Sequence, residues 1–253
     1  IRENTLDILC EKEEQKIHSD KNYIYAEDLF CVLDEDYIES SGKIPSLMLL
    51  KTYNATMQNQ KICTRPFYYS VINSVYDFHF CCGDWSDSAG NILENPPDAI
   101  WNSSIAKIFR LSLINRTYSF CNANACVHLK PQADTTNERM RDIPRTRDIP
   151  HTLEIGIDRT CNLFCKSCRD CVVVETGERK RRTEAAKDVI ISSGWLEKCN
   201  TLLLGGQGEV FFSNVYQELM FYGSEKRISL DLRTNGTLLT EEYFTKLKKK
   251  YKE

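Results

Sequence analysis

The sequence lacks any hydrophobic run long enough to cross a bilayer, and it lacks a large excess of either charge. Its longest apolar stretches, such as residues 47–50, are far shorter than the roughly 20 residues that a membrane helix needs. A net charge of −3 provides no basic surface for nucleic acid or for an anionic membrane. Residues 1–5 show neither the basic start nor the apolar stretch of a signal peptide. We therefore expect a cytoplasmic protein that binds neither nucleic acid nor membrane.

Glycine and proline are scarce at the beginning of the chain. Residues 1–60 contain only Gly42 and Pro45, and their apolar residues follow a helical spacing. This range is therefore predicted to be a helical segment, with no residues that indicate chemistry. A hydrophobic fraction of 42% and a charged fraction of 27% are typical of a globular protein with a substantial core.

Cysteine is abundant, with 12 residues in the chain. A secreted disulfide scaffold is one reading, but it suits short extracellular chains that cannot build a core. Here the cysteines cluster at the spacings of metal ligands, so reduced thiols and iron–sulfur clusters fit better.

Three cysteines form the most informative motif. Cys161, Cys165 and Cys168 follow the spacing C-x3-C-x2-C, which brings three thiolates into one loop. Three thiolates can hold three irons of a [4Fe–4S] cluster, and the fourth iron then keeps an open coordination position. Cys171 could instead supply a fourth thiolate and close the site, as in a ferredoxin or a zinc site. Because Cys171 precedes three valines, core packing is the preferred interpretation of its side chain.

Two further motifs follow in the sequence. Residues 202–209 read LLLGGQGE, a buried strand that runs into glycines and then an acid. Residues 230–237 read LDLRTNGT, a second strand that ends in Thr-Asn-Gly. With the strand at residues 152–157, these segments alternate with helices at 180–193, 214–222 and 240–251. Alternation of this kind predicts parallel strands joined by right-handed crossovers, with site residues at the carboxyl ends of the strands.

In this order, the three motifs resemble those of the radical SAM enzymes. The resemblance implies a [4Fe–4S] cluster on Cys161, Cys165 and Cys168, whose open iron chelates S-adenosylmethionine. It implies reductive cleavage of that cofactor to a 5′-deoxyadenosyl radical, which abstracts hydrogen from a peptide or small-molecule substrate. An electron donor such as a flavodoxin or a ferredoxin is implied as a partner. The fold implied for residues 151–253 is the N-terminal half of a partial (β/α) barrel, truncated after the third strand–helix unit.

The resemblance also assigns cofactor contacts. Gly205, Gly206 and Gly208 would let the backbone approach the methionyl end, and Glu209 would accept a hydrogen bond from its ammonium. The family more often has Gly-Gly-Glu in direct succession, so the inserted Gln207 and Gly208 change the register of the carboxylate. The remaining cofactor contacts that the resemblance assigns are Thr234 and Asn235 on the ribose side and Ser167, which stands where the family usually has an aromatic residue.

Residues 61–130 have a different character. Aromatic residues alternate at 64–69 and 75–80, which predicts the strands of a hairpin, and residues 98–113 predict a helix. The order of motifs resembles the auxiliary-cluster region called SPASM, although that region usually follows the barrel. A small cysteine-rich α+β region is therefore expected to precede the barrel. The ligands that the resemblance implies for a second [4Fe–4S] cluster are Cys63, Cys82, Cys121 and Cys126, with Cys81 as the alternative to Cys82.

Ligand type alone leaves zinc as an alternative at this auxiliary site. Residues 131–150 form a predicted linker, in which the sequence Arg-Asp-Ile-Pro occurs at 141–144 and again at 147–150. For the whole chain, the competing hypothesis is a non-catalytic iron–sulfur or zinc module that serves electron transfer or assembly.

Overall fold

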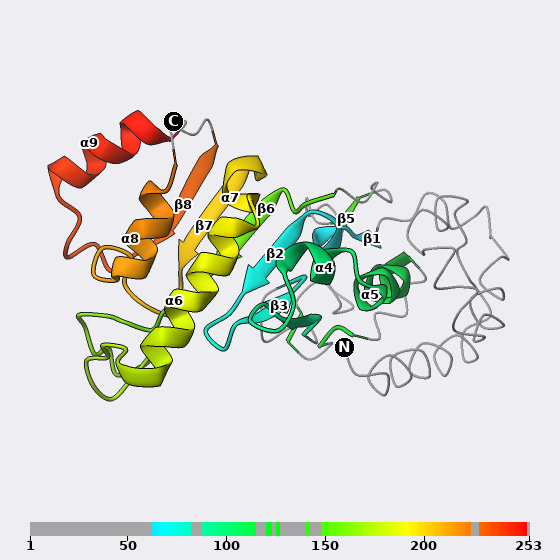
Figure 1. Cartoon of the computed structure of the whole chain (residues 1–253), viewed down its shortest axis with the longest axis horizontal. Coiled ribbons are helices and arrows are strands. Elements are labelled where there is room, and N and C mark those ends of the chain that lie inside the picture. The colour runs from blue at the N-terminus through cyan, green and yellow to red at the C-terminus, as the bar shows by residue number, and fades with distance from the viewer. Residues whose placement is uncertain are drawn as a thin grey trace, which may run out of the picture. The chain divides into compact units, whose positions relative to one another are not determined.

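The computed structural model describes residues 62–81, 88–114, 120–122, 125–126, 140–141, 148–223 and 228–251. The chain divides into two compact units (Figure 1). The unit that contains most of the described residues, called the larger unit here, comprises Tyr69–His79, Gly90–Ala99 and Ile149–Glu253. Within the described ranges, no helix is both long and apolar enough to span a membrane. The predicted helical segment 1–60 and most of the predicted linker 131–150 lie outside the described residues.

The larger unit is built on a six-stranded sheet in the order β4-β3-β2-β6-β7-β8. Its last three strands are β6 (Thr152–Ile155), β7 (Thr201–Gly205) and β8 (Ser229–Arg233), and they pair in parallel. The expected strand–helix alternation with parallel pairing is thus confirmed for this part of the chain. The barrel of radical SAM type remains a prediction.

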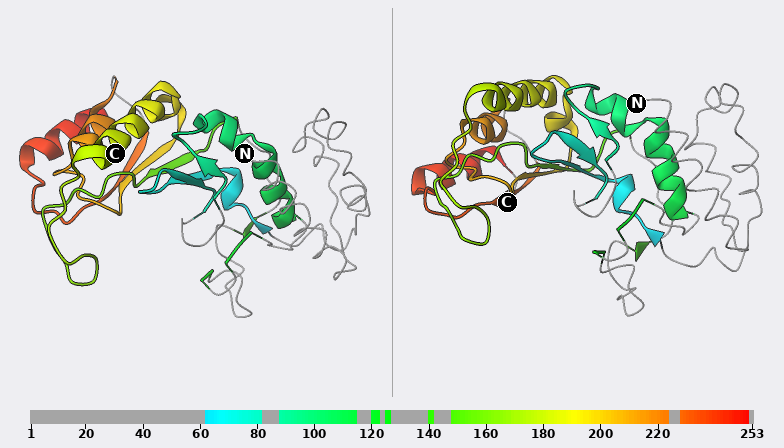
Figure 2. Two further views of the ribbon diagram at one scale, coloured as in Figure 1. Left: turned by 60° about the horizontal axis from the view of Figure 1, so that its bottom comes forward. Right: turned by 90° about the horizontal axis from the view of Figure 1, so that it is seen from below.

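Helices follow each of these strands in the chain. They are α6 (Gly177–Ser192), α7 (Trp195–Lys198), α8 (Asn214–Phe221) and α9 (Glu241–Lys250). Ser213 and Thr240 cap α8 and α9, because each side chain accepts a backbone N–H of the first turn. Strands β2, β6, β7 and β8 follow one another across the sheet in chain order. Right-handed crossovers therefore place α6 and α8 side by side on one face, as Figures 1 and 2 show.

The two faces of the sheet differ in chemistry. Leu153, Ile155, Leu202 and Leu204 are fully buried beneath the helices. Since successive strand residues point to opposite faces, Glu154 lies on the other face. There it is in register with Leu203 of β7 and Asp231 of β8. One face is therefore the apolar core, and the other carries charged side chains among apolar ones such as Leu203.

A hairpin extends the same sheet. Strands β2 (Tyr69–Ile72) and β3 (Asp77–His79) pair antiparallel, and β4 (Gly90–Asn91) adds to β3. A hairpin is present, and its second strand lies within the predicted range 75–80. The first predicted strand, 64–69, is wrong except for Tyr69, because Arg65–Phe67 form a short 3-10 helix, η3, and the strand begins after it. Pro66 explains this difference, because proline fixes φ and has no N–H to donate to a ladder. Strand β2 pairs in parallel with β6, so the sheet recruits residues from the range expected to form the cysteine-rich region.

The other unit contains β1 (Ile62–Cys63), paired antiparallel with β5 (Met140–Arg141). The helix expected at 98–113 is two helices, α4 (Pro97–Trp101) and α5 (Ser104–Ile114). Ser103 explains the break, because its hydroxyl accepts the N–H of Ala106 and thereby begins a new helix.

Arg110 of α5 lies in an aromatic core. Its guanidinium stacks over Trp101 at 4.3 Å and over Phe80 at 5.2 Å from the ring centroids. It donates to the backbone oxygens of Pro66 and Trp101, each at 3.0 Å. Burial lowers the pKa of Arg110 to about 9, since a charge is costly away from water.

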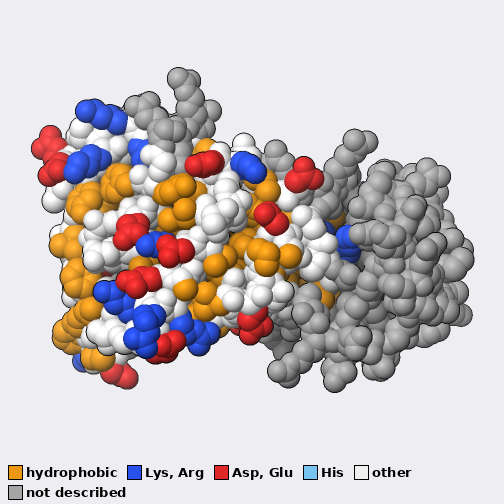
Figure 3. Space-filling view, viewed as in Figure 1, with side chains coloured by type: hydrophobic (Ala, Val, Ile, Leu, Met, Phe, Trp, Pro, Cys, Tyr) orange, Lys and Arg blue, Asp and Glu red, His pale blue; other side chains and the backbone are white. Residues whose placement is uncertain are grey.

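The outer surface of α6 carries both signs of charge. Figure 3 shows basic and acidic side chains interspersed over this helix. Arg181 pairs with Glu178, and Lys180 pairs with Glu184, all of them exposed. Pairs of this kind mark a solvated helix face and contribute little to stability.

Candidate functional site

The cysteine loop begins directly after β6 and is anchored to α8. Asp158 donates its N–H to the Tyr216 hydroxyl at 3.1 Å, and this hydroxyl lies 3.0 Å from the Asp158 carbonyl oxygen. The Asp158 carboxylate accepts the Thr160 N–H at 2.8 Å and the Ser213 hydroxyl at 2.5 Å. Burial raises the pKa of Tyr216 far above its usual range, so the hydroxyl keeps its proton. The residues before Cys161 are therefore held by buried hydrogen bonds.

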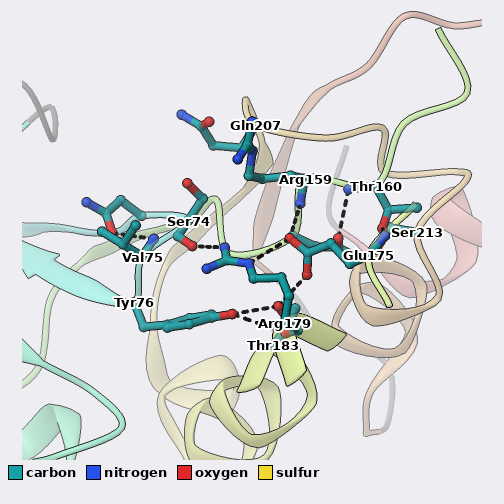
Figure 4. A network of polar contacts seen from close by, with 12 residues as sticks. Ser74, Val75, Tyr76, Arg159, Thr160, Glu175, Arg179, Thr183, Gln207 and Ser213 are labelled. Carbon is teal, nitrogen blue, oxygen red and sulfur yellow. Dashed lines mark hydrogen bonds and ion pairs between the residues drawn. The ribbon is translucent and has the colours of Figure 1, made fainter. Parts of the chain in front are cut away.

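Glu175 ties the two ends of the loop together (Figure 4). Its carboxylate accepts the Arg159 N–H at 3.1 Å, and its own N–H donates to the Thr160 hydroxyl at 3.1 Å. The Thr183 hydroxyl donates to the carboxylate at 2.5 Å, and Arg179 donates from Nε at 3.1 Å. Glu175 is 9% exposed, so these contacts replace water around a buried charge. The loop from 159 to 175 is closed at its base by one side chain.

Residues between β2 and β3 complete this network. The Tyr76 hydroxyl lies 2.8 Å from the Thr183 hydroxyl, which already donates to Glu175, so Tyr76 is the donor. Arg179 stacks over the Tyr76 ring at 4.6 Å and donates to the Ser74 carbonyl oxygen. Tyr76 has a φ of 68°, a conformation that is strained for a non-glycine residue. The hairpin therefore helps to support the base of the cysteine loop.

The glycine turn after β7 packs against the beginning of the cysteine loop. A Cβ at Gly208 would lie 2.6 Å from the carbonyl oxygens of both Asp158 and Thr160. A Cβ at Gly205 would lie 2.5 Å from the carbonyl oxygen of Arg233 on β8. These glycines are thus required by close approach of neighbouring backbone, whether or not a cofactor is bound.

Glu209 joins the glycine turn to the end of β8. It is 2% exposed, and its carboxylate accepts the Thr234 hydroxyl and the Asn235 N–H, each at 2.6 Å. The Phe211 N–H donates to the same carboxylate at 3.2 Å. Asn235 in turn donates through its side chain to Asn162 at 2.9 Å, inside the cysteine loop. The three sequence motifs are therefore connected directly by hydrogen bonds.

The three motifs line one cleft of about 270 Å³ at the carboxyl ends of β6, β7 and β8. The structure brings together Cys161, Cys165 and Cys168, the turn residues 206–209, and residues 233–235. Cys161 is half-buried, whereas Cys165 and Cys168 are exposed. N–H donors approach two of the sulfur atoms. The Leu163 backbone lies 3.5 Å from Cys161 Sγ, and Arg169 Nη2 lies 3.5 Å from Cys168 Sγ.

These thiols do not form a finished metal site. Among the described residues, no group of three or more His, Cys, Asp or Glu side chains is placed to hold a metal ion. The donor set nevertheless suits an iron–sulfur cluster, because three thiols face one cleft with N–H donors beside two of them. Such donors stabilise the negative charge of thiolate and cluster sulfur.

Five residues of the cysteine loop lie apart from the cleft lining. Cys171 is exposed, and Val172 and Val174 beside it are 47% and 55% exposed. The interpretation of Cys171 as a core residue is therefore wrong, because the loop projects into solvent here. Ser167 is exposed in the turn before Cys168 and does not line the cleft, and Phe164 is 61% exposed.

The expected auxiliary ligands lie in the smaller unit. Cys63, Cys81, Cys121 and Cys126 are half-buried, and Cys82 lies outside the described residues. Two of them follow core aromatics directly, since Cys81 follows Phe80 and Cys121 follows Phe120. Both rings pack on Phe109, with centroids at 5.3 and 5.7 Å. The second cluster stays a prediction.

Two arginines of the cleft were not predicted from the sequence. Arg169 donates to the Arg159 carbonyl oxygen at 2.8 Å and to the Gln207 carbonyl oxygen at 2.6 Å, which joins the cysteine loop to the glycine turn. Arg233 ends β8 and lines the cleft beside Thr234. The rule that site residues lie at strand carboxyl ends would have identified Arg233. Nothing in the sequence would have identified the contacts of Arg169.

The sequence matches no family model, and no solved structure matches the chain. It is similar to an AdoMet-dependent heme synthase from Nitratidesulfovibrio vulgaris, with 28% identity over 109 residues. This similarity covers 39% of the present chain and 29% of the relative, so the chain spans less than a third of the relative's length. The relative's name states a dependence on S-adenosylmethionine. The similarity supports a radical SAM relationship at the level of the superfamily.

Proposed function

We propose that this chain is part of a radical SAM enzyme that uses the cleft between the three motifs. The observation that carries this proposal is the convergence of the cysteine loop, the glycine turn and the end of β8 on one cleft. The contacts of Glu209 with Thr234 and Asn235, and of Asn235 with Asn162, join motifs that are more than 70 residues apart at their extremes. A closed ferredoxin or zinc site has no use for such an arrangement.

Cys161, Cys165 and Cys168 would hold a [4Fe–4S] cluster, and the open iron would bind S-adenosylmethionine. When bound, this group supplies the one-electron reduction that cleaves the cofactor and leads to hydrogen abstraction from a substrate. The exposed position of Cys171 outside the cleft favours three protein ligands over four. The substrate would be a peptide or a small molecule, and a flavodoxin or ferredoxin would be the electron donor.

The other residues of the cleft would bind and orient the cofactor. Gly206 lines the cleft without a side chain of its own, and the Arg233 side chain lies close to its backbone. Glu209 already has three donors from the chain, so its first role is to hold Thr234 and Asn235 in place. Its position at the cleft still allows it to attract an ammonium group. Arg169 would keep the cysteine loop against the glycine turn and shield the site from water.

The smaller unit would hold a second, auxiliary cluster on Cys63, Cys82, Cys121 and Cys126, with Cys81 as the alternative to Cys82. This part of the proposal is carried by the cysteine order and by the aromatic core that holds Phe80 and Phe120. A site of four thiolates would be closed and would serve electron transfer or structure.

Anaerobic reconstitution with iron and sulfide tests the catalytic proposal. The reduced protein should give a low-temperature EPR signal of a [4Fe–4S] cluster that changes when S-adenosylmethionine is added. C165A and C168A should lose this response, whereas the matched variant C171A should keep it. A cluster signal that ignores the cofactor, or that disappears in C171A, would favour the non-catalytic module.

A further inference from the structure

The polar face of the sheet holds a charged contact that crosses three of its strands. Glu154 on β6 is 8% exposed, and both of its carboxylate oxygens have partners. The Tyr69 hydroxyl on β2 donates to one oxygen, and Arg233 Nη1 on β8 donates to the other at 2.5 Å. Tyr69 itself is 4% exposed. Tyr69 holds the buried Glu154 carboxylate in place, and this carboxylate in turn fixes the direction of the Arg233 side chain.

Two glycines, the last residue of β7 and the one after it, lie beside Arg233. Gly205 and Gly206 lie between Glu154 and Arg233 in the order of strands. A Cβ at Gly206 would lie 3.1 Å from Arg233 Nη1, and one at Gly205 would lie 2.5 Å from the Arg233 carbonyl oxygen. The glycine pair therefore serves Arg233 as well as any cofactor. A side chain at Gly206 would crowd the guanidinium where it lies at the end of β7.

Arg233 keeps donors available in the cleft. Its side chain is 50% exposed, and Glu154 is its one partner among the described residues, through Nη1. Arg169, the other arginine of the cleft lining, already donates to two carbonyl oxygens and to a cysteine sulfur. Glu209, the acidic residue of the cleft lining, accepts hydrogen bonds from three donors of the chain and does not contact Arg233 among the described residues. Arg233 thus offers N–H donors to a molecule in the cleft, and Glu154 balances part of its charge.

We infer that Arg233 binds a carboxylate group of a molecule in this cleft, and that Glu154 and Tyr69 hold it in position. A guanidinium presents a planar fork of N–H groups that matches a carboxylate. Given the proposed function on which this inference rests, the carboxylate belongs either to the methionyl part of S-adenosylmethionine or to the substrate. Both sources share the same chemistry, and binding measurements separate them.

The test uses calorimetric titration of the iron-free 253-residue chain, so it does not depend on a loaded cluster. The probes are S-adenosylhomocysteine, its decarboxylated analogue, and succinate. R233Q should weaken binding of a carboxylate probe by at least about tenfold, the loss expected when a charge-assisted hydrogen bond is removed. R181Q, on the outer surface of α6, is the matched control and should bind like wild type.

The pattern of loss identifies the source. If the carboxylate is the cofactor's, R233Q weakens S-adenosylhomocysteine and spares the decarboxylated analogue. If the carboxylate is the substrate's, R233Q should leave the affinity for S-adenosylhomocysteine unchanged. It should then abolish the binding of succinate to the protein that already holds S-adenosylhomocysteine. Equal binding of all probes by wild type and R233Q would overturn the inference, and an EPR response to S-adenosylmethionine would still be tested separately.

Two further variants guard against a folding defect. R233Q leaves the buried Glu154 with one partner fewer, so E154Q/R233Q removes both charges together. The double variant should fold, as judged by circular dichroism, and should still fail to bind the carboxylate probe. E154Q alone keeps the guanidinium but not its orientation, so its affinity should fall between those of wild type and R233Q. Full affinity in E154Q would contradict the positioning role.

Discussion

Glu209 accepts the backbone N–H of Asn235 at 2.6 Å, a contact between the turn after β7 and the residue that follows β8 by two. The same carboxylate accepts the Thr234 hydroxyl. The end of one strand is therefore held in place by the turn that follows its neighbour. This contact makes the shape of the cleft depend on a buried carboxylate rather than on the loops alone.

Replacement of Thr234 by valine tests this contact. The change keeps the branched shape and removes one donor to a buried carboxylate. We expect the free energy of unfolding to fall by about 1–3 kcal/mol, the cost of a buried polar group that loses a partner. Urea unfolding followed by circular dichroism measures it. Thr245→Val, at an exposed position of α9, is the control and should change stability by no more than about 0.5 kcal/mol.

Gly208 should not tolerate a methyl group. Its Cβ would meet two carbonyl oxygens at 2.6 Å, and backbone cannot move aside cheaply. We expect Gly208→Ala to cost about 1–3 kcal/mol of stability and to lower iron uptake at the cysteine loop. Gly156→Ala is the control, because the nearest atom to its Cβ lies at 3.4 Å. Equal stability of the two variants would show that the turn is not packed as described.

Glu175 should matter far more than its neighbour Glu178. Glu175→Gln removes the negative charge of the carboxylate that accepts hydrogen bonds from Thr183, Arg159 and Arg179. We expect the free energy of unfolding to fall by about 1–3 kcal/mol. Glu178 is 70% exposed and pairs with an exposed arginine, so Glu178→Gln should have almost no effect. Proteolysis of the loop 159–175, followed by mass spectrometry, gives a second measurement. Faster cleavage in Glu175→Gln alone is the expected result.

Tyr216 predicts an alkaline loss of stability. Burial raises the pKa of its hydroxyl, and burial does the same for Tyr251. Above the ordinary tyrosine pKa of about 10, the unfolded chain releases these protons before the folded chain does. Stability is therefore fully present below this pH and is lost as the pH rises further.

Tyr216→Phe should change both the stability at neutral pH and its dependence on alkaline pH. At neutral pH it should lose about 1–3 kcal/mol, because Asp158 loses its partner in a buried place. Above about pH 10 its unfolding free energy should fall less steeply than that of wild type. Tyr243→Phe, whose hydroxyl donates to Gln217, controls for the loss of a tyrosine hydroxyl. A slope that is identical in wild type and Tyr216→Phe would contradict the buried position of this hydroxyl.

The auxiliary site predicts a change in metal content. Cys126→Ala in the whole chain should lower bound iron by about four atoms, with matching loss of sulfide, because a closed cubane needs its full shell. Cys171→Ala, an exposed cysteine outside both expected sites, should leave the iron content unchanged. Loss of one zinc with no change in sulfide would identify the site as a zinc module instead.

Some of this structure could be predicted from the sequence. The apolar runs at 152–157 and 201–204 indicate parallel strands, because such strands are buried on both faces of the sheet and so lack a polar alternation. The spacing of Cys161, Cys165 and Cys168 predicts a loop directly after the first of them. Local patterns of this kind are informative because strand, turn and cap preferences act within a few residues.

Other features could not be predicted in this way. The parallel pairing of β2 with β6 joins segments about 80 residues apart, and no local pattern reports it. Cys171 looks apolar in sequence because valines follow it, but exposure is set by how far the loop projects. The contact of Glu154 with Arg233 requires the order of strands, since the two residues are 79 positions apart. Tertiary placement, not residue type, decides these cases.

The unequal edges of the sheet have a consequence for how the fold can be extended. At one edge, β4 contributes two residues and β3 three, and both run antiparallel, so this edge offers little backbone for another strand. At the other edge, β8 presents five residues in parallel orientation. The described sheet can therefore be extended by another strand more readily beside β8 than beside β4. A further strand–helix unit would pair beside β8, which offers the longer row of backbone groups, and not beside the two-residue strand β4.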